Sequence, residues 1–150
     1  MMPANKPRIL LIGTADTKSD ELLFLRRRIE EGGGGVLLMD VGILGSASFT
    51  PEVSNTEVSA AADATLAQLA NMGDENAAMS LMAKGATCLA RSLFSEGRID
   101  GMLALGGTMG TDLALDVAAA LPVGVPKVVV STIAYSHLLP PERIPADLIM

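Results

Sequence analysis

The residues best suited to chemistry form a glycine-rich segment, Leu105-Gly-Gly-Thr-Met-Gly-Thr111. It follows an apolar run typical of a strand and opens a helical pattern, and this position faces ligands in open α/β sheets. Glycines let backbone N–H groups approach a phosphate, and a helix amino terminus adds positive partial charge. The alternative is that the glycines only make a tight turn; no Walker A lysine follows them. The segment predicts an anion site at Gly106, Gly107, Thr108, Met109, Gly110 and Thr111.

A second segment of this kind is Gly13-Thr-Ala-Asp-Thr-Lys18, which also follows an apolar run and leads into a helical pattern. The carboxyl ends of parallel strands share one edge of a sheet, so both segments are expected to face one crevice. Thr14, Thr17 and Lys18 are candidate phosphate contacts, and Asp16 is a candidate for holding a metal ion or orienting a hydroxyl. In the alternative interpretation, Asp16 and Thr17 only cap the helix.

Three further polar residues end predicted strands at the same edge. Asp40 stands where nucleotide-binding α/β folds often place an acid on ribose hydroxyls, although an acid there can equally bind loop backbone. Ser131 and Thr132 supply hydroxyls that either complete the pocket or satisfy loop backbone. The single histidine, His137, has no neighbours at metal-ligand or triad spacing and is expected in a surface loop. No metal-ligating set is predicted, and Cys88 is expected to be a small buried hydrophobe.

Composition limits the classes to which the chain can belong. Its 150 residues are 49% hydrophobic, which suits one compact domain. A net charge of -6 argues against nucleic-acid binding. Aspartates interrupt every apolar stretch before it reaches membrane-spanning length. A single cysteine excludes an internal disulfide and is typical of a cytoplasmic protein.

The elements expected around these segments alternate regularly. Short apolar runs predict strands at residues 8–14, 36–41, 101–105 and 128–131, and the beginning of another at 146–150. A first helix is predicted after the capping-box spacing at 17–20, and a second from 54 to about 73, where the same spacing recurs at its start. Two more helices are predicted, from 74 to 97 and from about 111 to 121. This alternation predicts a doubly wound, Rossmann-like α/β fold, with a mainly parallel sheet and helices on both faces.

The motifs taken as a set resemble a known family. They are the two segments above, Asp40-Val-Gly42, Asp100-Gly101, and 121–127 through Ser131-Thr132, in the same order from about Lys6 to Met150. The chain resembles the uncharacterised ATP-binding family related to the tomato mosaic virus resistance protein. The resemblance implies that residues 1–150 form most of the N-terminal ATP-binding domain of a longer two-domain protein. It also implies nucleotide contacts at Gly13, Thr14, Asp16, Thr17, Gly106, Gly107, Gly110 and Thr111.

The first hypothesis for function is therefore an ATP-binding domain, with ATP as cofactor and magnesium left open. The alternatives are a protein-interaction module controlled by nucleotide, or an enzyme acting on a phosphorylated metabolite. Whether the chain is an enzyme stays open, because only Asp16, Lys18 and Asp112 are candidate catalytic groups. The expected partners are the nucleotide and either a second domain or another copy of the chain, with neither nucleic acid nor membrane among them.

Overall fold

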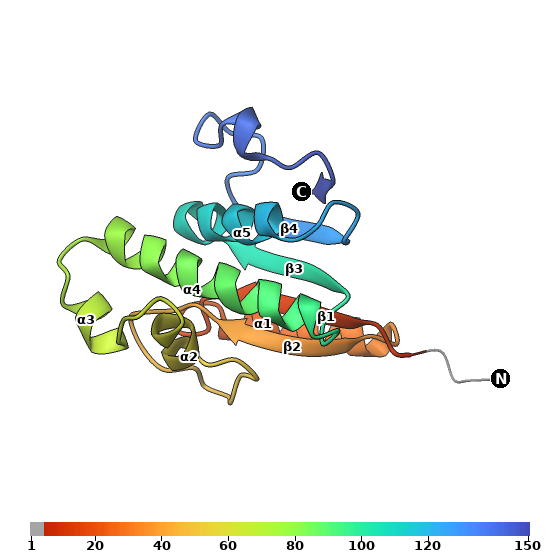
Figure 1. Ribbon diagram of the computed structural model, residues 1–150, viewed down its shortest axis with the longest axis horizontal. Helices are drawn as coiled ribbons and strands as arrows, with labels where there is room; N and C mark the ends of the chain where they lie inside the picture. The colour runs from red at the N-terminus through yellow and green to blue at the C-terminus, as the bar shows by residue number, and fades with distance from the viewer. Residues whose placement is uncertain (1–4) are drawn as a thin grey trace.

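The chain folds around a five-stranded parallel sheet, and the computed structural model describes residues 5–150. The strands are β1 (Arg8–Gly13), β2 (Gly35–Asp40), β3 (Gly101–Gly106), β4 (Lys127–Ser131) and β5 (Leu148–Ile149), in the spatial order β2-β1-β3-β4-β5. The helices are α1 (Ser19–Glu31), α2 (Asn55–Ala60), α3 (Leu66–Ala70), α4 (Glu75–Ser95) and α5 (Thr108–Ala120), with a 3-10 turn, η1, at Pro141–Arg143. The predicted doubly wound α/β fold is confirmed (Figure 1).

The central strands form because their residues are apolar on both faces. In β1, Leu10, Leu11 and Ile12 are at most 1% exposed. Leu11 pairs with Leu38 of β2 on one side and with Leu103 of β3 on the other. A parallel sheet that is covered on both faces requires continuous apolar runs of this kind. The four longer strands accordingly lie within one residue of their predicted positions.

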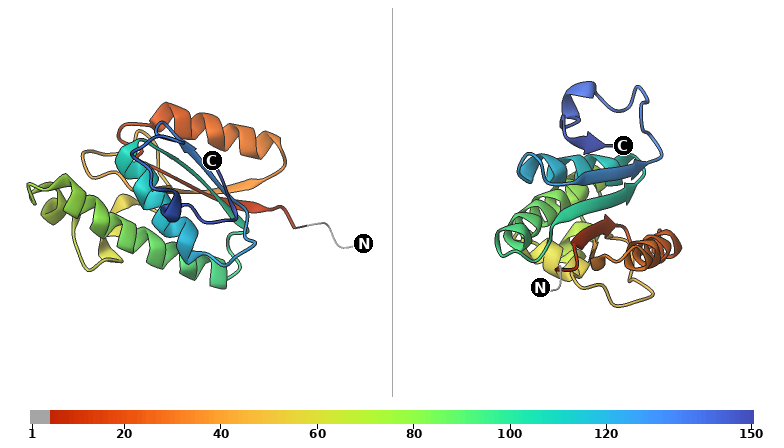
Figure 2. Two further views of the ribbon diagram at one scale, coloured as in Figure 1. Left: turned by 90° about the horizontal axis from the view of Figure 1, so that it is seen from above. Right: turned by 90° about the vertical axis from the view of Figure 1, so that its right-hand side faces the viewer.

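Helices lie on both faces of the sheet, as expected (Figure 2). One face carries α4 and α5, and the larger core lies there around Leu10, Met82 and Leu113. The other face carries α1, whose Leu22 packs against Leu38 in a smaller core. The two cores hold the sheet between them and fix the positions of the strand ends.

The α1 face of the sheet is only partly covered. In the right-hand view of Figure 2, α1 lies over β1 and β2, and no described helix covers β4 on this face of the sheet. Phe24 of α1, Leu105 of β3 and Val130 of β4 line a shallow apolar hollow there, with Phe24 54% and Val130 47% exposed. We call these three residues the open sheet face.

The segment predicted as one helix over residues 54–73 is instead two short helices, α2 and α3. The expected capping box of Ser54 and Glu57 is present and begins α2. The chain then turns at Asp63, whose φ of 58° no helix can contain. A second capping box, between Thr65 and Gln68, begins α3. The prediction of a continuous helix was wrong because it followed the apolar stripe and overlooked this second box.

Helix α4 runs along the sheet and is fixed by a close approach to α2. A Cβ atom added to Gly85 would lie 1.9 Å from the carbonyl oxygen of Val58. Only glycine allows the two backbones to meet at this distance. This contact sets the position of α4, whose amino-terminal turns reach the carboxyl edge of the sheet. Among the residues that the structure describes, no helix has the length and apolar character needed to cross a membrane.

Candidate functional site

The two predicted segments meet at the carboxyl edge of the sheet. The chain moves from β1 outward to β2 and then returns to β3 on the other side of β1. Strand order therefore reverses between β1 and β3, where ligands bind in open α/β sheets. A cavity of about 370 Å³ opens at this point. Its lining includes Thr14, Asp16 and Thr17 from the first segment and residues 106–110 from the second.

The first segment forms a hydrogen-bonded turn in front of α1. The hydroxyls of Thr14 and Thr17 are 2.7 Å apart and share a hydrogen bond, and the Lys18 N–H donates to the Thr14 carbonyl at 2.9 Å. Lys18 is the N-cap of α1 and makes no capping bond with its side chain. The predicted capping box over residues 17–20 was therefore wrong, because the Thr17 hydroxyl is used inside the turn. Lys18 brings a cation to the cavity.

Gly13 lies beneath this turn rather than in the cavity lining. A Cβ atom there would lie 2.8 Å from the Leu22 side chain, so the glycine allows α1 to pack closely against the end of β1. This contact positions the turn, while the residues after it face the cavity.

Asp40 holds the first segment in place. Its carboxylate is 1% exposed, and Oδ1 accepts hydrogen bonds from the Ala15 N–H at 3.0 Å and the Gly42 N–H at 2.9 Å. Burial raises the pKa of Asp40, and the two backbone hydrogen bonds oppose that shift. Asp40 is not among the residues that line the cavity. Its carboxylate therefore supports the loops after β1 and β2, as the alternative interpretation of this residue expected.

Asp16 lines the cavity and has unused hydrogen-bonding capacity. Its Oδ2 accepts from the Leu44 N–H at 2.9 Å. Its Oδ1 is buried without a hydrogen-bond partner among residues 5–150. A Cβ atom on Gly42 would lie 2.6 Å from this Oδ1, so the glycine makes room for the carboxylate. An oxygen of this kind is a candidate for contact with a bound ligand or ion.

The second segment forms the amino terminus of α5, which begins at Thr108 and not near residue 111 as expected. Its N-cap, Gly107, has no side chain to accept from the first-turn N–H groups, and residues 108–110 of this first turn line the cavity. A Cβ atom on Gly106 would lie 2.6 Å from the backbone of Gly110, whereas one on Gly107 would meet nothing nearer than 3.7 Å. Packing thus requires glycine at 106 but not at 107.

The remaining predicted hydroxyls connect α5 to β4 behind the cavity. The Thr111 hydroxyl is fully buried and lies 2.6 Å from the Ser131 hydroxyl. Ser131 in turn accepts from the Ile133 N–H, and the Thr132 N–H donates to the Gly106 carbonyl. None of these three predicted residues lines the cavity. They position the glycine segment, in agreement with the alternative that they satisfy loop backbone.

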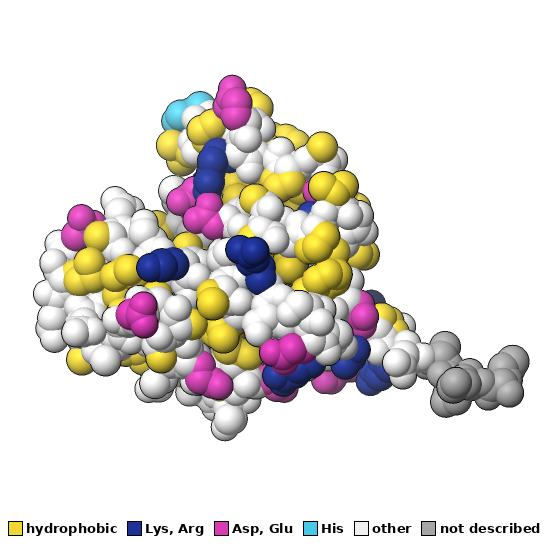
Figure 3. All heavy atoms as spheres, in the orientation of Figure 1, with side chains coloured by type: hydrophobic (Ala, Val, Ile, Leu, Met, Phe, Trp, Pro, Cys, Tyr) yellow, Lys and Arg dark blue, Asp and Glu magenta, His cyan; other side chains and the backbone are white. Residues whose placement is uncertain are grey.

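Four lining residues were missed by the sequence analysis. Ile43 and Leu44 come from the loop after β2, and Glu75 and Met79 come from the first turns of α4. No motif marks them, because they reach the cavity only through the packing of α4 and of that loop. In Figure 3 the surface is hollowed between α4 and the segment after β4.

Two predictions about single residues had different outcomes. His137 is exposed in the segment after β4, as expected. Cys88 is exposed on α4, so the expectation that it is a buried hydrophobe was wrong. It lies on the outer side of the helix between the buried Ala86 and Ala90. Over residues 5–150, no group of three or more His, Cys, Asp or Glu side chains could hold a metal ion.

The chain is similar to proteins of known sequence over nearly its full length. The family model described as "Uncharacterised protein family (UPF0261) N-terminal domain" matches residues 7–144. A UPF0261 protein of Brucella suis biovar 1 is 60% identical over 146 residues, which cover 97% of this chain and 35% of the relative. One of Clostridium tetani is 36% identical over 133 residues, covering 89% of this chain and 33% of the relative. The chain thus spans about a third of the length of these curated relatives.

More distant similarity extends to tomato, Solanum lycopersicum. The ToMV resistance protein Tm-1(GCR237) is 29% identical over 148 residues, which cover 87% of this chain and 19% of that protein. The ToMV susceptible protein tm-1(GCR26) matches equally well. Because both tomato proteins match to the same degree, the similarity belongs to the shared domain and not to resistance.

Proposed function

The chain belongs to the uncharacterised family UPF0261, as an N-terminal domain, and we propose that this domain binds ATP with its phosphates at the glycine segment 106–110. The observation that carries the proposal is the meeting of two strand-end loops at one cavity of about 370 Å³, where strand order reverses between β1 and β3. Mononucleotides bind at such positions in other doubly wound sheets.

The chemistry of the cavity suits phosphate. First-turn N–H groups of α5 lack a capping side chain, so a phosphate oxygen can accept from them. Lys18 adds a positive charge on the opposite loop, and the hydroxyls of Thr14 and Thr108 are hydrogen-bond donors. Gly107 strengthens the proposal, because packing leaves room for a side chain there and yet none is present.

Magnesium fits the proposal through Asp16. A magnesium ion bound to ATP takes oxygen ligands and keeps several waters. Asp16 lines the cavity, and its Oδ1 has no hydrogen-bond partner among the described residues, so we assign Asp16 to that ion or to one of its waters. We expect Asp16→Asn to weaken binding of ATP with magnesium while leaving binding of ATP alone nearly unchanged. Calorimetry with and without magnesium measures the difference, and an equal loss in both conditions would exclude this role.

The central test is calorimetry of ATP binding to the chain and to Gly107→Asp. The substitution places a negative side chain in the phosphate segment, and the space around Gly107 allows it without disturbing the backbone. Val123→Asp is the matched control, since it adds the same charge at a 92% exposed position before β4, at the opposite edge of the sheet. We expect at least a tenfold loss of affinity in Gly107→Asp alone. Equal binding by all three proteins would refute the phosphate site.

A further inference from the structure

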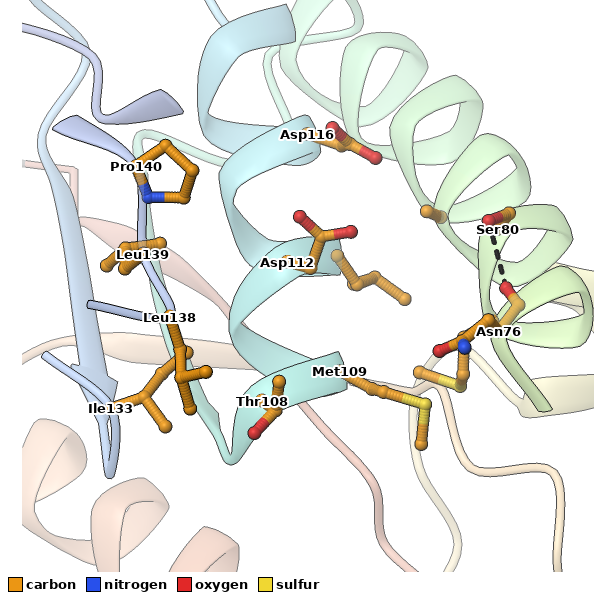
Figure 4. A pocket seen from close by; sticks show the side chains of 13 residues that line it. Asn76, Ser80, Thr108, Met109, Asp112, Asp116, Ile133, Leu138, Leu139 and Pro140 are labelled. Carbon is orange, nitrogen blue, oxygen red and sulfur yellow. Dashed lines mark hydrogen bonds between the residues drawn. The ribbon is translucent and has the colours of Figure 1, made fainter. Parts of the chain in front are cut away.

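A second cavity adjoins the cavity of about 370 Å³ in which we place the phosphates, and it has no assigned role. Its volume is about 300 Å³, and it lies between the amino-terminal halves of α4 and α5 and the segment after β4 (Figure 4). Met79, Thr108 and Met109 line both cavities. A ligand with phosphates at the amino terminus of α5 can therefore extend directly into this second space.

One wall of the second cavity is apolar. Leu138, Leu139 and Pro140 lie on one side of α5 in Figure 4, and Met109 lies at its amino-terminal end. Leu139 is 7% exposed, so this segment is packed against the body of the domain. Methionine thioethers pack favourably against aromatic rings. This wall suits a flat, largely apolar group such as a nucleobase.

The other wall carries two carboxylates on successive turns of α5. Asp112 and Asp116 both line the cavity, and both bind Arg143, at 2.5 Å from Asp112 and 2.9 Å from Asp116. These bonds raise the pKa of Arg143, chiefly through the hydrogen bond to Asp116. The guanidinium holds both acids in place and offsets part of their charge beside a polyphosphate. The Asp112 side chain is 70% exposed and keeps free acceptor capacity.

We propose that the second cavity holds the nucleoside end of ATP, with Asp112 accepting from the ribose hydroxyls and the base against Met109 and the 138–140 segment. The inference rests on the proposed function, because it assumes phosphates at the amino terminus of α5. Asp112 follows Thr108 by four residues, or about 6 Å along a helix axis, which places it next to the sugar of a nucleotide bound there. Asp40 is buried beneath the loops, so we assign the contact with the ribose hydroxyls to Asp112 and not to Asp40.

The first experiment fills the second cavity and compares two ligands, ATP and inorganic tripolyphosphate. Ser80 lines the cavity from the exposed side of α4, so Ser80→Trp blocks the space without removing a core contact. Ser95→Trp is the control, since Ser95 is exposed near the other end of α4 and its hydroxyl likewise bonds to backbone in its own helix. We expect Ser80→Trp to weaken ATP at least tenfold while tripolyphosphate binds as before, and Ser95→Trp to change neither.

The outcomes separate the two proposals. If the unmodified chain binds neither ligand, the phosphate site itself is wrong and the nucleoside site falls with it. If ATP binds and Ser80→Trp leaves its affinity unchanged, or weakens tripolyphosphate by the same factor, the nucleoside lies elsewhere while the phosphate site stands.

The second experiment tests Asp112 with 2′,3′-dideoxy-ATP, which lacks the ribose hydroxyls. A hydrogen bond to a carboxylate is lost, so the unmodified chain should bind the analogue about tenfold more weakly than ATP. Asp112→Ala removes the acceptor and should reduce this discrimination to near unity. Asp116→Ala likewise removes a bond to Arg143 and is the control that should keep the discrimination. Unchanged discrimination in Asp112→Ala would overturn the assignment of Asp112.

Discussion

Replacing Asp40 tests whether its carboxylate supports loops or contacts ligand. In Asp40→Ala the N–H groups of Ala15 and Gly42 lose their acceptor. A buried donor without a partner costs about 1–3 kcal/mol, so we expect unfolding to become easier by about 2–4 kcal/mol once partial relaxation is allowed. Asp40→Asn keeps an oxygen for both donors and removes a buried charge, so its stability at pH 7 should lie within about 1 kcal/mol of the unmodified chain.

The pH dependence of the same variants gives an independent check. Because burial raises the pKa of Asp40, the folded chain holds a proton there at pH values where the unfolded chain has already lost it. Stability contributed by this group is therefore present at low pH and falls as pH rises from about 3.8, the ordinary value, through the raised pKa. Neither variant should show this pH-dependent contribution to folding stability. Only Asp40→Ala should have a lowered free energy of unfolding over the whole pH range.

Urea unfolding followed by circular dichroism from pH 4 to 8 measures both effects. Calorimetry of ATP binding to Asp40→Asn should show affinity close to that of the unmodified chain. The reasoning is refuted if Asp40→Ala is as stable as the unmodified chain, or if Asp40→Asn is as damaging as Asp40→Ala. A large loss of ATP affinity in a stable Asp40→Asn variant would instead indicate that Asp40 contacts the ribose.

Three other outcomes are expected. Gly106→Ala should destabilise the domain by about 1–3 kcal/mol through overpacking, while Gly107→Ala should change urea stability little, because only the first meets backbone within 3 Å. Gly85→Ala should be more damaging, by about 3 kcal/mol or more, and should raise protease sensitivity around α2; a stable variant would contradict the close approach. The hydrogen bond from Lys127 lowers the pKa of Asp147. The contribution of Asp147 to folding stability is therefore complete above about pH 3.8, and it is lost as the pH falls toward the lowered pKa. The melting temperature of Asp147→Asn should lack this dependence on acid pH.

The fold could be predicted from the sequence because its strands are buried on both faces. Runs such as those around Leu11 and Leu103 must be apolar throughout, and glycines end them at the sheet edge. The break between α2 and α3 was harder to predict, since the apolar stripe continues across Asp63 and only the capping box at Thr65 marks the new start.

The candidate site was predicted in part, for a physical reason. Backbone conformation at strand ends is encoded locally by glycine and threonine, so both loops could be located. Which side chains face the cavity depends on burial. Asp40 and Asp16 look alike in sequence, yet the first is enclosed by backbone donors and the second lines the cavity. Glu75 and Met79 approach from α4, whose placement depends on the contact between Gly85 and Val58 of α2.

The open sheet face bears on how the chain behaves at high concentration. Phe24 and Val130 present apolar surface to water, and Leu105 lines the same hollow. Salts such as sulfate strengthen the burial of apolar surface, so self-association should increase with added sulfate and be reversed by dilution. Val130→Lys should raise the solubility limit without lowering the melting temperature, because the side chain already meets solvent. Crystallisation trials and ligand titrations would then be limited by this patch rather than by the stability of the fold.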